Sequence, residues 1–270
     1  MSISRISAAF AKRAASGEGV FVAYLMAGDP DLETSKELLL GLPLAGADIV
    51  ELGMPFSDPV AEGPTIQQAA QRALLAHTKM KDVLALATEF RAQHPDTPLI
   101  LMGYANPIHY MGWEHFAEAA MKAGVDGLII VDLPPEESEP LAQALDANDI
   151  ALIRLIAPTT GEERLPQVLS GISGFVYYVS VTGVTGAIVP DGDEVALAVR
   201  QIKQHTDLPV AVGFGVRDPK TARIIAAAAD GVVVGSAIVA ALEAGGPKAA
   251  LQLTKDLAEA SQCKTRRAMI

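Results

Sequence analysis

The sequence predicts an α/β protein with a single (β/α)8 TIM barrel. Eight short runs of strand-forming residues alternate with stretches that have helical periodicity. The runs are hydrophobic almost without interruption, which is typical of strands buried on both faces of a parallel sheet. The 270 residues fit one such domain, 1–270. A doubly wound open sheet is the alternative; the barrel is favoured because eight units account for the chain without a linker.

The expected strands are distributed along the whole chain. They are the runs at 21–27, 48–54, 98–106, 127–133, 151–157, 174–181, 209–215 and 231–238. Several of the segments between them begin with Asp, Thr or Pro and end at Gly or Asn, as capped helices do. Residues 1–16 should form an extra N-terminal helix, and a short phosphate-binding helix should follow the eighth strand. The basic tail, about 261–270, is expected to fray.

The composition restricts the partners and the compartment. A net charge of −11 and a pI near 4.9 argue against nucleic acid and anionic membranes as general partners. A small anionic ligand is still allowed, because backbone amides bind phosphate without Lys or Arg. The single cysteine, Cys263, gives no disulfide framework, and the sequence has neither a secretory signal nor an apolar run of about 18 residues. We therefore expect a soluble, cytoplasmic protein.

The second expected strand carries a carboxylate on the side that should face the barrel. Alternation places Ile49, Glu51 and Gly53 on one side, and the apolar residues between them on the side that packs under helices. Desolvation would raise the pKa of an unpaired Glu51 at the barrel mouth, which suits acid–base chemistry near neutral pH. The alternative is a buried ion pair, for which Arg154 on the fifth strand is the nearest candidate.

Other candidate residues follow the ends of the expected strands. Glu62 lies in the Gly/Pro-rich loop after the second strand, and Asp132 after the fourth strand either lines the site or caps the next helix. Glycine-rich segments follow the last three strands, and Gly235 and Ser236 open the expected short helix. Such elements bind phosphate in barrels, although any single glycine can serve an ordinary turn.

The residue types missing from the strands narrow the reaction class. None of the eight runs contains Lys, so the nucleophile of a Schiff-base aldolase is missing. None contains His, and no histidine stands beside a carboxylate pair at metal-ligand spacing, so no metal site is expected. These absences leave acid–base chemistry by carboxylates on a phosphorylated substrate.

Six segments resemble the tryptophan synthase α chain family, in the same order and at similar spacing. They are VELGMPFSDPVAEGPTIQQAAQRAL, YANPIHYMG, VDLPPEES, YYVSVTGVTG, GFGV and VVVGSAIV. The resemblance implies a lyase of tryptophan biosynthesis that cleaves indole-3-glycerol phosphate to indole and glyceraldehyde 3-phosphate. It implies no cofactor in this chain, and a partner β chain that carries pyridoxal phosphate in an α2β2 heterotetramer. Protonation of the indole at C3 would supply the electron sink that a Schiff base or a metal supplies elsewhere.

The resemblance also implies a role for individual residues. Glu51 matches the general acid/base and Tyr177 the aromatic residue beside the substrate side chain. Glu62 stands where the family has an aspartate that meets the indole N–H, and its extra methylene moves the carboxylate by roughly 1.5 Å. The other matched positions are the phosphate cradle (Gly186, Gly215, Gly235, Ser236), the indole pocket (Tyr24, Met102, Asp132, Phe214), the closing loop (Thr185) and the β-chain contact (Pro55, Asp58, Pro59, Asn106).

Three other functions are kept as alternatives. The chain could be a catalytically weakened α-type subunit that acts mainly as an allosteric activator of a β chain, since Glu62 departs from the family pattern. It could also be a free-standing indole-3-glycerol phosphate lyase, or another phosphate-binding barrel such as an isomerase. Activity without any partner would favour the lyase.

Overall fold

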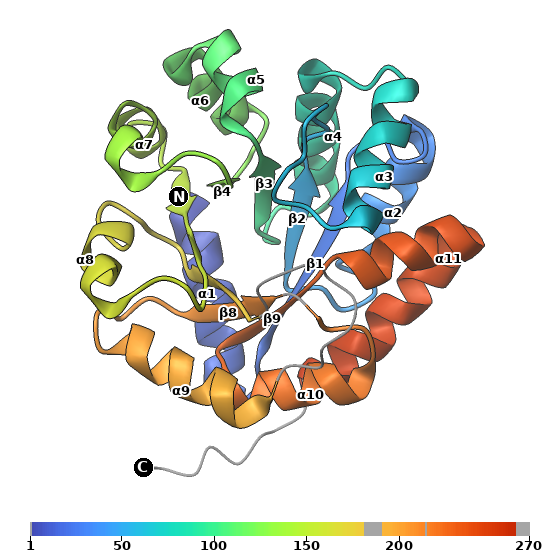
Figure 1. The fold of residues 1–270 in the computed structure, drawn as a ribbon. Helices are drawn as coiled ribbons and strands as arrows, with labels where there is room; N and C mark the ends of the chain where they lie inside the picture. The colour runs from blue at the N-terminus through green and yellow to red at the C-terminus, as the bar shows by residue number, and fades with distance from the viewer. Residues whose placement is uncertain (1, 181–190, 214, 263–270) are drawn as a thin grey trace.

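Nine parallel strands form the central sheet of the computed structural model, which describes residues 2–180, 191–213 and 215–262 (Figure 1). The strands are β1 (Val20–Met26), β2 (Ile49–Gly53), β3 (Leu99–Gly103), β4 (Gly127–Ile130), β5 (Ala151–Ile153), β6 (Leu155–Ile156), β7 (Val176–Val179), β8 (Val210–Gly213) and β9 (Gly231–Val234).

The two ends of the sheet are two halves of one interrupted strand. The strand order is β5-β4-β3-β2-β1-β9-β8-β7-β6, so that β5 and β6 are its two ends. These two strands are consecutive in the chain and are separated only by Arg154. The first half pairs with β4 and the second half with β7, which gives a barrel with eight strand positions. The predicted (β/α)8 fold is confirmed.

Helices surround the strands (Figure 1). They are α1 (Ser2–Ser16), α2 (Leu32–Gly41), α3 (Pro64–Leu75), α4 (Met80–Gln93), α5 (Ala105–Met111), α6 (Trp113–Lys122), α7 (Glu139–Asp146), α8 (Leu165–Val168), α9 (Gly192–Lys203), α10 (Pro219–Ala228) and α11 (Ser236–Ser261), with 3-10 turns at Pro135–Glu137 and Glu162–Arg164. The side chains of Asp31 and Asp218 accept backbone N–H groups where α2 and α10 begin. Within the residues described, no helix combines the length and the apolar character needed to cross a membrane.

Helix α11 begins directly after the last strand and is kinked. Gly246 has a φ of +71° and is followed by Pro247, which cannot donate a hydrogen bond to the preceding turn. The expected short helix after the last strand is therefore the part of α11 that precedes Gly246.

The strands separate two hydrophobic clusters, as their alternation requires. Ile49 belongs to the cluster inside the barrel, together with residues from the other strands such as Ile100 and Val233. Val50 and Leu52 belong to the cluster between the strands and the helices. The side chain of Glu51 consequently lies on the interior side of β2, as predicted.

Helix α1 closes the barrel at the amino ends of the strands. Phe10 packs against Phe175 with ring centroids 5.6 Å apart, and both belong to the interior cluster. Arg5 forms an ion pair of 2.7 Å with the buried carboxylate of Asp126, which also accepts the backbone N–H of Leu99. Helix α1 thus covers the interior at this end of the barrel.

Candidate active site

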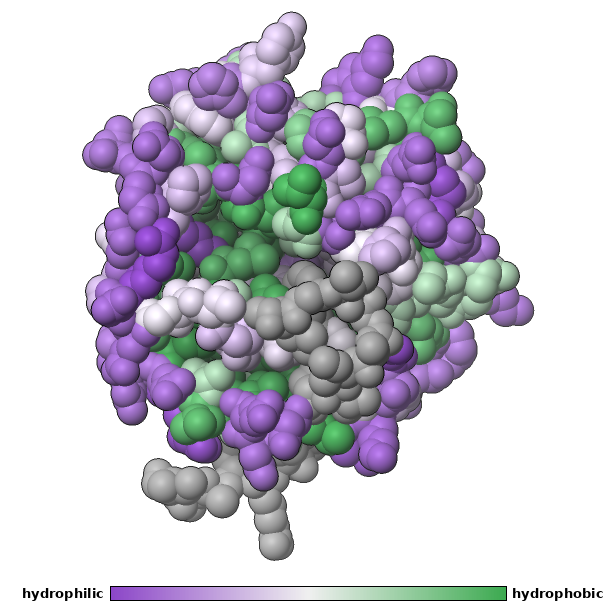
Figure 2. Space-filling view, in the orientation of Figure 1, coloured by the Kyte–Doolittle hydropathy of each residue, from purple (hydrophilic) through white to green (hydrophobic). Residues whose placement is uncertain are grey.

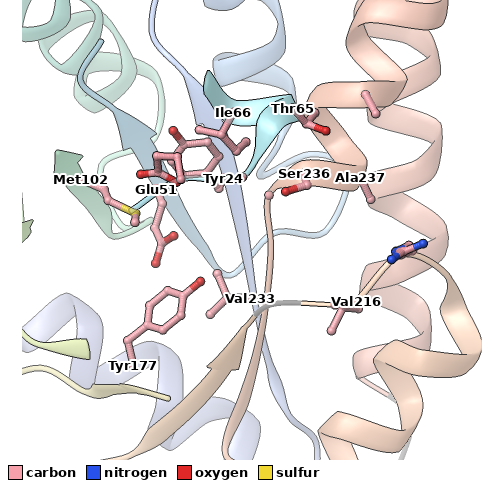
Figure 3. Close-up of a pocket in the computed structure, with 16 residues that line it drawn as sticks. Tyr24, Glu51, Thr65, Ile66, Met102, Tyr177, Val216, Val233, Ser236 and Ala237 are labelled. Atoms are coloured by element: carbon pink, nitrogen blue, oxygen red, sulfur yellow. The ribbon is translucent and has the colours of Figure 1, made fainter. Parts of the chain in front are cut away.

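A cavity of about 360 Å³ opens at the carboxyl ends of the strands (Figure 3). Its volume lies in the range of small-molecule sites. In the view of Figure 2, hydrophobic residues are visible near the centre of the face, and hydrophilic residues predominate at its periphery. The cavity brings together eight of the residues that the sequence singled out, namely Tyr24, Glu51, Glu62, Met102, Tyr177, Gly215, Gly235 and Ser236.

Glu51 is buried in the cavity wall. It lies in the middle of β2, beside Tyr24 of β1 and Ile100 of β3, and is 1% exposed. Among the residues that the structure describes, neither of its carboxyl oxygens has a hydrogen-bond partner. Burial, and secondly the charge of Glu62, raises the pKa of Glu51 to about 8. At neutral pH the group therefore holds a proton that it can donate.

The alternative in which Arg154 neutralises Glu51 is wrong. The Arg154 guanidinium donates to the backbone oxygens of Val168 and Ser170, at 2.9 and 2.8 Å, and to the hydroxyl of Ser138. It therefore stabilises the segments that follow β4 and β6 instead of the acid in the cavity.

Glu62 is positioned by the loop that follows β2. The backbone on one side of it is fixed because Ala61 N–H donates to the Tyr104 hydroxyl at 3.0 Å. Its own carbonyl accepts a hydrogen bond of 2.9 Å from the Gln67 side chain on α3. Burial raises the pKa of Glu62 to about 7. The cavity therefore holds two carboxyl groups that both titrate near neutral pH. Glu51, the more buried of the two, keeps its proton to a higher pH than Glu62.

Two tyrosines line the cavity with the carboxyl groups, and the ring of each packs closely against a glycine of a neighbouring strand. A Cβ atom on Gly53 would lie 2.2 Å from the Tyr24 hydroxyl, and one on Gly213 would lie 2.3 Å from that of Tyr177. The Tyr177 hydroxyl points toward Glu51 in Figure 3. Burial, followed by the nearby glutamates, holds the pKa of both phenols well above the usual value. Both tyrosines stay neutral and act as hydrogen-bonding groups.

The opposite side of the cavity is suited to an anion. Gly235 precedes the first turn of α11, whose N–H groups have no partner within the helix, and Ser236 begins that helix. Gly215 has a φ of +89°, a conformation that favours glycine and lets the backbone approach a ligand. Helix starts of this kind attract phosphate through their amides and their dipole. Arg217 also lines the cavity.

Other predicted residues are not among those that line this cavity. Asp132 is exposed and accepts the backbone N–H of Ala105 at 2.8 Å, where α5 begins. Asp58 and Pro59 line a separate hollow of about 540 Å³, whereas Pro55 and Asn106 line neither. Three predicted residues lie outside the part of the chain that the structure describes, namely Thr185, Gly186 and Phe214.

Several lining residues were not predicted from the sequence. Thr65 and Ile66 enter the wall because α3 begins two residues after Glu62, and a proline in the first turn could have indicated this start. Val216 and Arg217 are the two residues after the predicted Gly215, but nothing in the local pattern showed which way they face. Within the described ranges, no group of three or more His, Cys, Asp or Glu residues is arranged to hold a metal ion.

Comparisons with known proteins identify related chains. A family model described as "Tryptophan synthase alpha chain" matches residues 10–268. The tryptophan synthase alpha chain of Caulobacter sp. (strain K31) is 55% identical over 259 residues, which cover 96% of this chain and 92% of that protein. The one from Phenylobacterium zucineum is 57% identical over 239 residues, which cover 88% and 86%.

Solved structures are similar over almost the whole fold. Mycobacterium tuberculosis tryptophan synthase gives a TM-score of 0.90 at 36% identity, covering 96% of this chain and 98% of that chain. Tryptophan synthase subunit alpha from Legionella pneumophila gives a TM-score of 0.87 at 38% identity, covering 95% and 97%.

Proposed function

Because the chain belongs to the tryptophan synthase alpha chain family, we propose that Glu51, Glu62 and Tyr177 perform its reaction inside the cavity described above. The activity is the lyase reaction of the family, in which indole-3-glycerol phosphate is cleaved to indole and glyceraldehyde 3-phosphate in tryptophan biosynthesis. The observation that carries the assignment of residues is the buried and unpartnered carboxyl group of Glu51 in the cavity wall.

Glu51 acts first as an acid and then as a base. Its raised pKa keeps it protonated, so that it can donate the proton to C3 of the indole ring. The resulting carboxylate then accepts the proton of the hydroxyl group on the carbon attached to the ring. As that hydroxyl becomes an aldehyde, the bond between the carbon and C3 breaks and its electron pair returns to the ring. Glu51 recovers its proton, and indole and glyceraldehyde 3-phosphate are formed.

Glu62 stabilises the ring while the ring is positively charged. Protonation at C3 makes the ring nitrogen electron-poor, and a carboxylate at its N–H lowers the energy of that state. The pKa of Glu62, about 7, lies below that of Glu51, about 8, so ionised Glu62 and protonated Glu51 coexist near neutral pH. The hydrogen bonds that fix the loop at Ala61 and Gln67 support a productive position for the longer side chain.

The remaining side chains bind the substrate. Tyr24 and Met102 contact the indole, and Tyr177 lies beside the glycerol portion, since all three line the cavity. Amides at Gly215, Gly235 and Ser236 hold the phosphate. From the family resemblance we also assign Gly186 to the phosphate cradle, Phe214 and Asp132 to the indole pocket, and Thr185 to a loop that closes over the substrate.

The family membership implies a β-chain partner in the complex. We propose that the assembly is an α2β2 heterotetramer in the cytoplasm, that pyridoxal phosphate is bound by the β chain, and that this chain, one domain over 1–270, needs no cofactor. Pro55, Asp58, Pro59 and Asn106 are the proposed contact. Asp58 and Pro59 support it, because they line a hollow on the surface of the molecule.

Release of indole from indole-3-glycerol phosphate, measured with and without a β chain, tests this function. We expect cleavage that rises when the β chain is added. Equal turnover without the partner would favour a free-standing lyase. Activation of the β chain without any cleavage would favour the weakened, mainly allosteric subunit.

A further inference from the structure

Arg217 provides a positive charge at a cavity that otherwise carries acids. It lies in the loop between β8 and α10, two residues after Gly215, and lines the cavity together with Gly235 and Ser236. Of the described residues that line the cavity, it alone is a Lys, Arg or His. The two glutamates belong to β2 and the loop that follows it, whereas Arg217 belongs to the loop after β8, so acidic and basic lining residues come from different strand ends.

The Arg217 side chain is free to accept an anion. It is exposed, and within the described part of the chain no carboxylate or other acceptor binds it. Other arginines of the chain are engaged in ion pairs, among them Arg5, Arg13, Arg72, Arg91 and Arg164. A guanidinium in a cavity that also contains a helix start adds a full charge to the partial charges of the amides.

We propose that Arg217 forms an ion pair with the phosphate group of the substrate and so selects phosphorylated ligands. The proposal rests on the proposed function, because it assumes that the phosphate lies beside Gly215 and Ser236. The guanidinium attracts the dianion electrostatically and presents several N–H donors to its oxygens. The charge also orients the substrate, because the phosphate is drawn away from the two glutamates and the indole is left beside them.

The ion pair should act on binding more than on chemistry. The phosphate does not change charge during the cleavage, so its contact contributes equally to the bound substrate and to the transition state. Loss of the contact should therefore raise KM and leave kcat nearly unchanged. Hydrogen bonds to charged groups correspond to roughly a tenfold effect on a dissociation constant, and solvent exposure makes the effect salt-dependent.

Binding of two partial ligands tests the phosphate contact independently of the contacts to the indole ring. Glycerol 3-phosphate carries the phosphate without the ring, and indole carries the ring without the phosphate. Their dissociation constants are measured by calorimetry on the complex with the β chain, for the unaltered chain, Arg217→Gln and Arg217→Lys. Arg223→Gln is the matched control, because it removes the same charge from an exposed position on α10 that does not line the cavity.

For Arg217→Gln we expect glycerol 3-phosphate to bind about tenfold more weakly at low salt, with indole unaffected, and Arg217→Lys to recover part of the loss. Arg223→Gln should bind both ligands as the unaltered chain does. If the unaltered complex cleaves the substrate but Arg217→Gln and Arg223→Gln bind glycerol 3-phosphate equally well, the proposed role of Arg217 is overturned and the proposed function is not. Failure of the unaltered complex to cleave the substrate would overturn the proposed function as well.

Discussion

Replacing Glu51 with glutamine should stabilise the folded chain at alkaline pH. In the folded state burial raises the pKa of Glu51 from 4.5 to about 8, whereas the unfolded chain releases this proton near the ordinary value. Between these two values the folded state binds one proton more than the unfolded state. The free energy of unfolding therefore falls as the pH rises through this window, and the contribution of the protonated group is fully present only below it.

The size of the change in the free energy of unfolding follows from the pKa shift of Glu51. One pKa unit corresponds to about 1.4 kcal/mol, so a shift from 4.5 to about 8 corresponds to on the order of 5 kcal/mol. Glutamine has nearly the shape of the protonated acid and cannot ionise. The two proteins should therefore be equally stable in acid. As the pH rises between the two pKa values, the free energy of unfolding of the variant should increasingly exceed that of the unaltered chain. Glu62 titrates in both proteins, so its contribution largely cancels from the difference.

Urea unfolding followed by circular dichroism, at a series of pH values from about 5 to about 8, measures the difference between the two proteins. We expect Glu51→Gln to unfold at a higher urea concentration at the alkaline end and at nearly the same concentration at the acid end. A difference that did not vary with pH would refute the reasoning, because it would mean that Glu51 is already ionised in the folded protein.

Three further substitutions test other parts of the structure. Glu62→Asp should give no gain in kcat, because the Glu62 carboxylate already lines the cavity; a large gain in steady-state assays would identify the longer side chain as a lesion. Arg72→Ala should lower the free energy of unfolding by about 3–5 kcal/mol, since it leaves the carboxylate of Asp29, which is 1% exposed and bound by Arg72 at 2.6 and 3.0 Å, buried without its cation. A loss of less than about 1 kcal/mol in urea unfolding would show that Asp29 finds another partner. Gly53→Ala should raise KM by displacing the Tyr24 ring into the cavity, because the new Cβ would lie 2.2 Å from the Tyr24 hydroxyl; an unchanged KM would mean that the ring can move elsewhere.

The orientation of Glu51 could be predicted because it depends only on local periodicity. In a strand every second side chain faces the same way, and the apolar character of Val50 and Leu52 marks the side that packs under helices. A charged residue at the intervening position must then face the interior. The structure agrees, since Val50 and Leu52 lie in the outer cluster and Glu51 lines the cavity.

The residues at which strands end were less predictable, because they depend on hydrogen bonds to residues far away in the sequence. The apolar run at 98–106 predicted one long strand, but β3 ends at Gly103 and α5 begins at Ala105. The N–H of Ala105 donates to the carboxylate of Asp132, which lies 27 positions further along the chain. Likewise, the run at 151–157 gave no sign of a break at Arg154, because the break reflects pairing of its two halves with different neighbours.

Arg217 was missed for a related reason. Its proposed role depends on Gly235 and Ser236, which line the same cavity but come from another strand end. A basic residue in a loop is common, and only the closed barrel shows that this one lines the cavity with the proposed phosphate-binding residues.

Single-turnover cleavage of indole-3-glycerol phosphate by Glu51→Gln, in complex with the β chain, tests the central claim most directly. If Glu51 is the acid and the base, the variant should bind glycerol 3-phosphate with unchanged affinity and cleave the substrate roughly 10³-fold or more slowly. Cleavage within about tenfold of the unaltered chain, at the same ligand affinity, would contradict the assignment of the reaction to this carboxyl group.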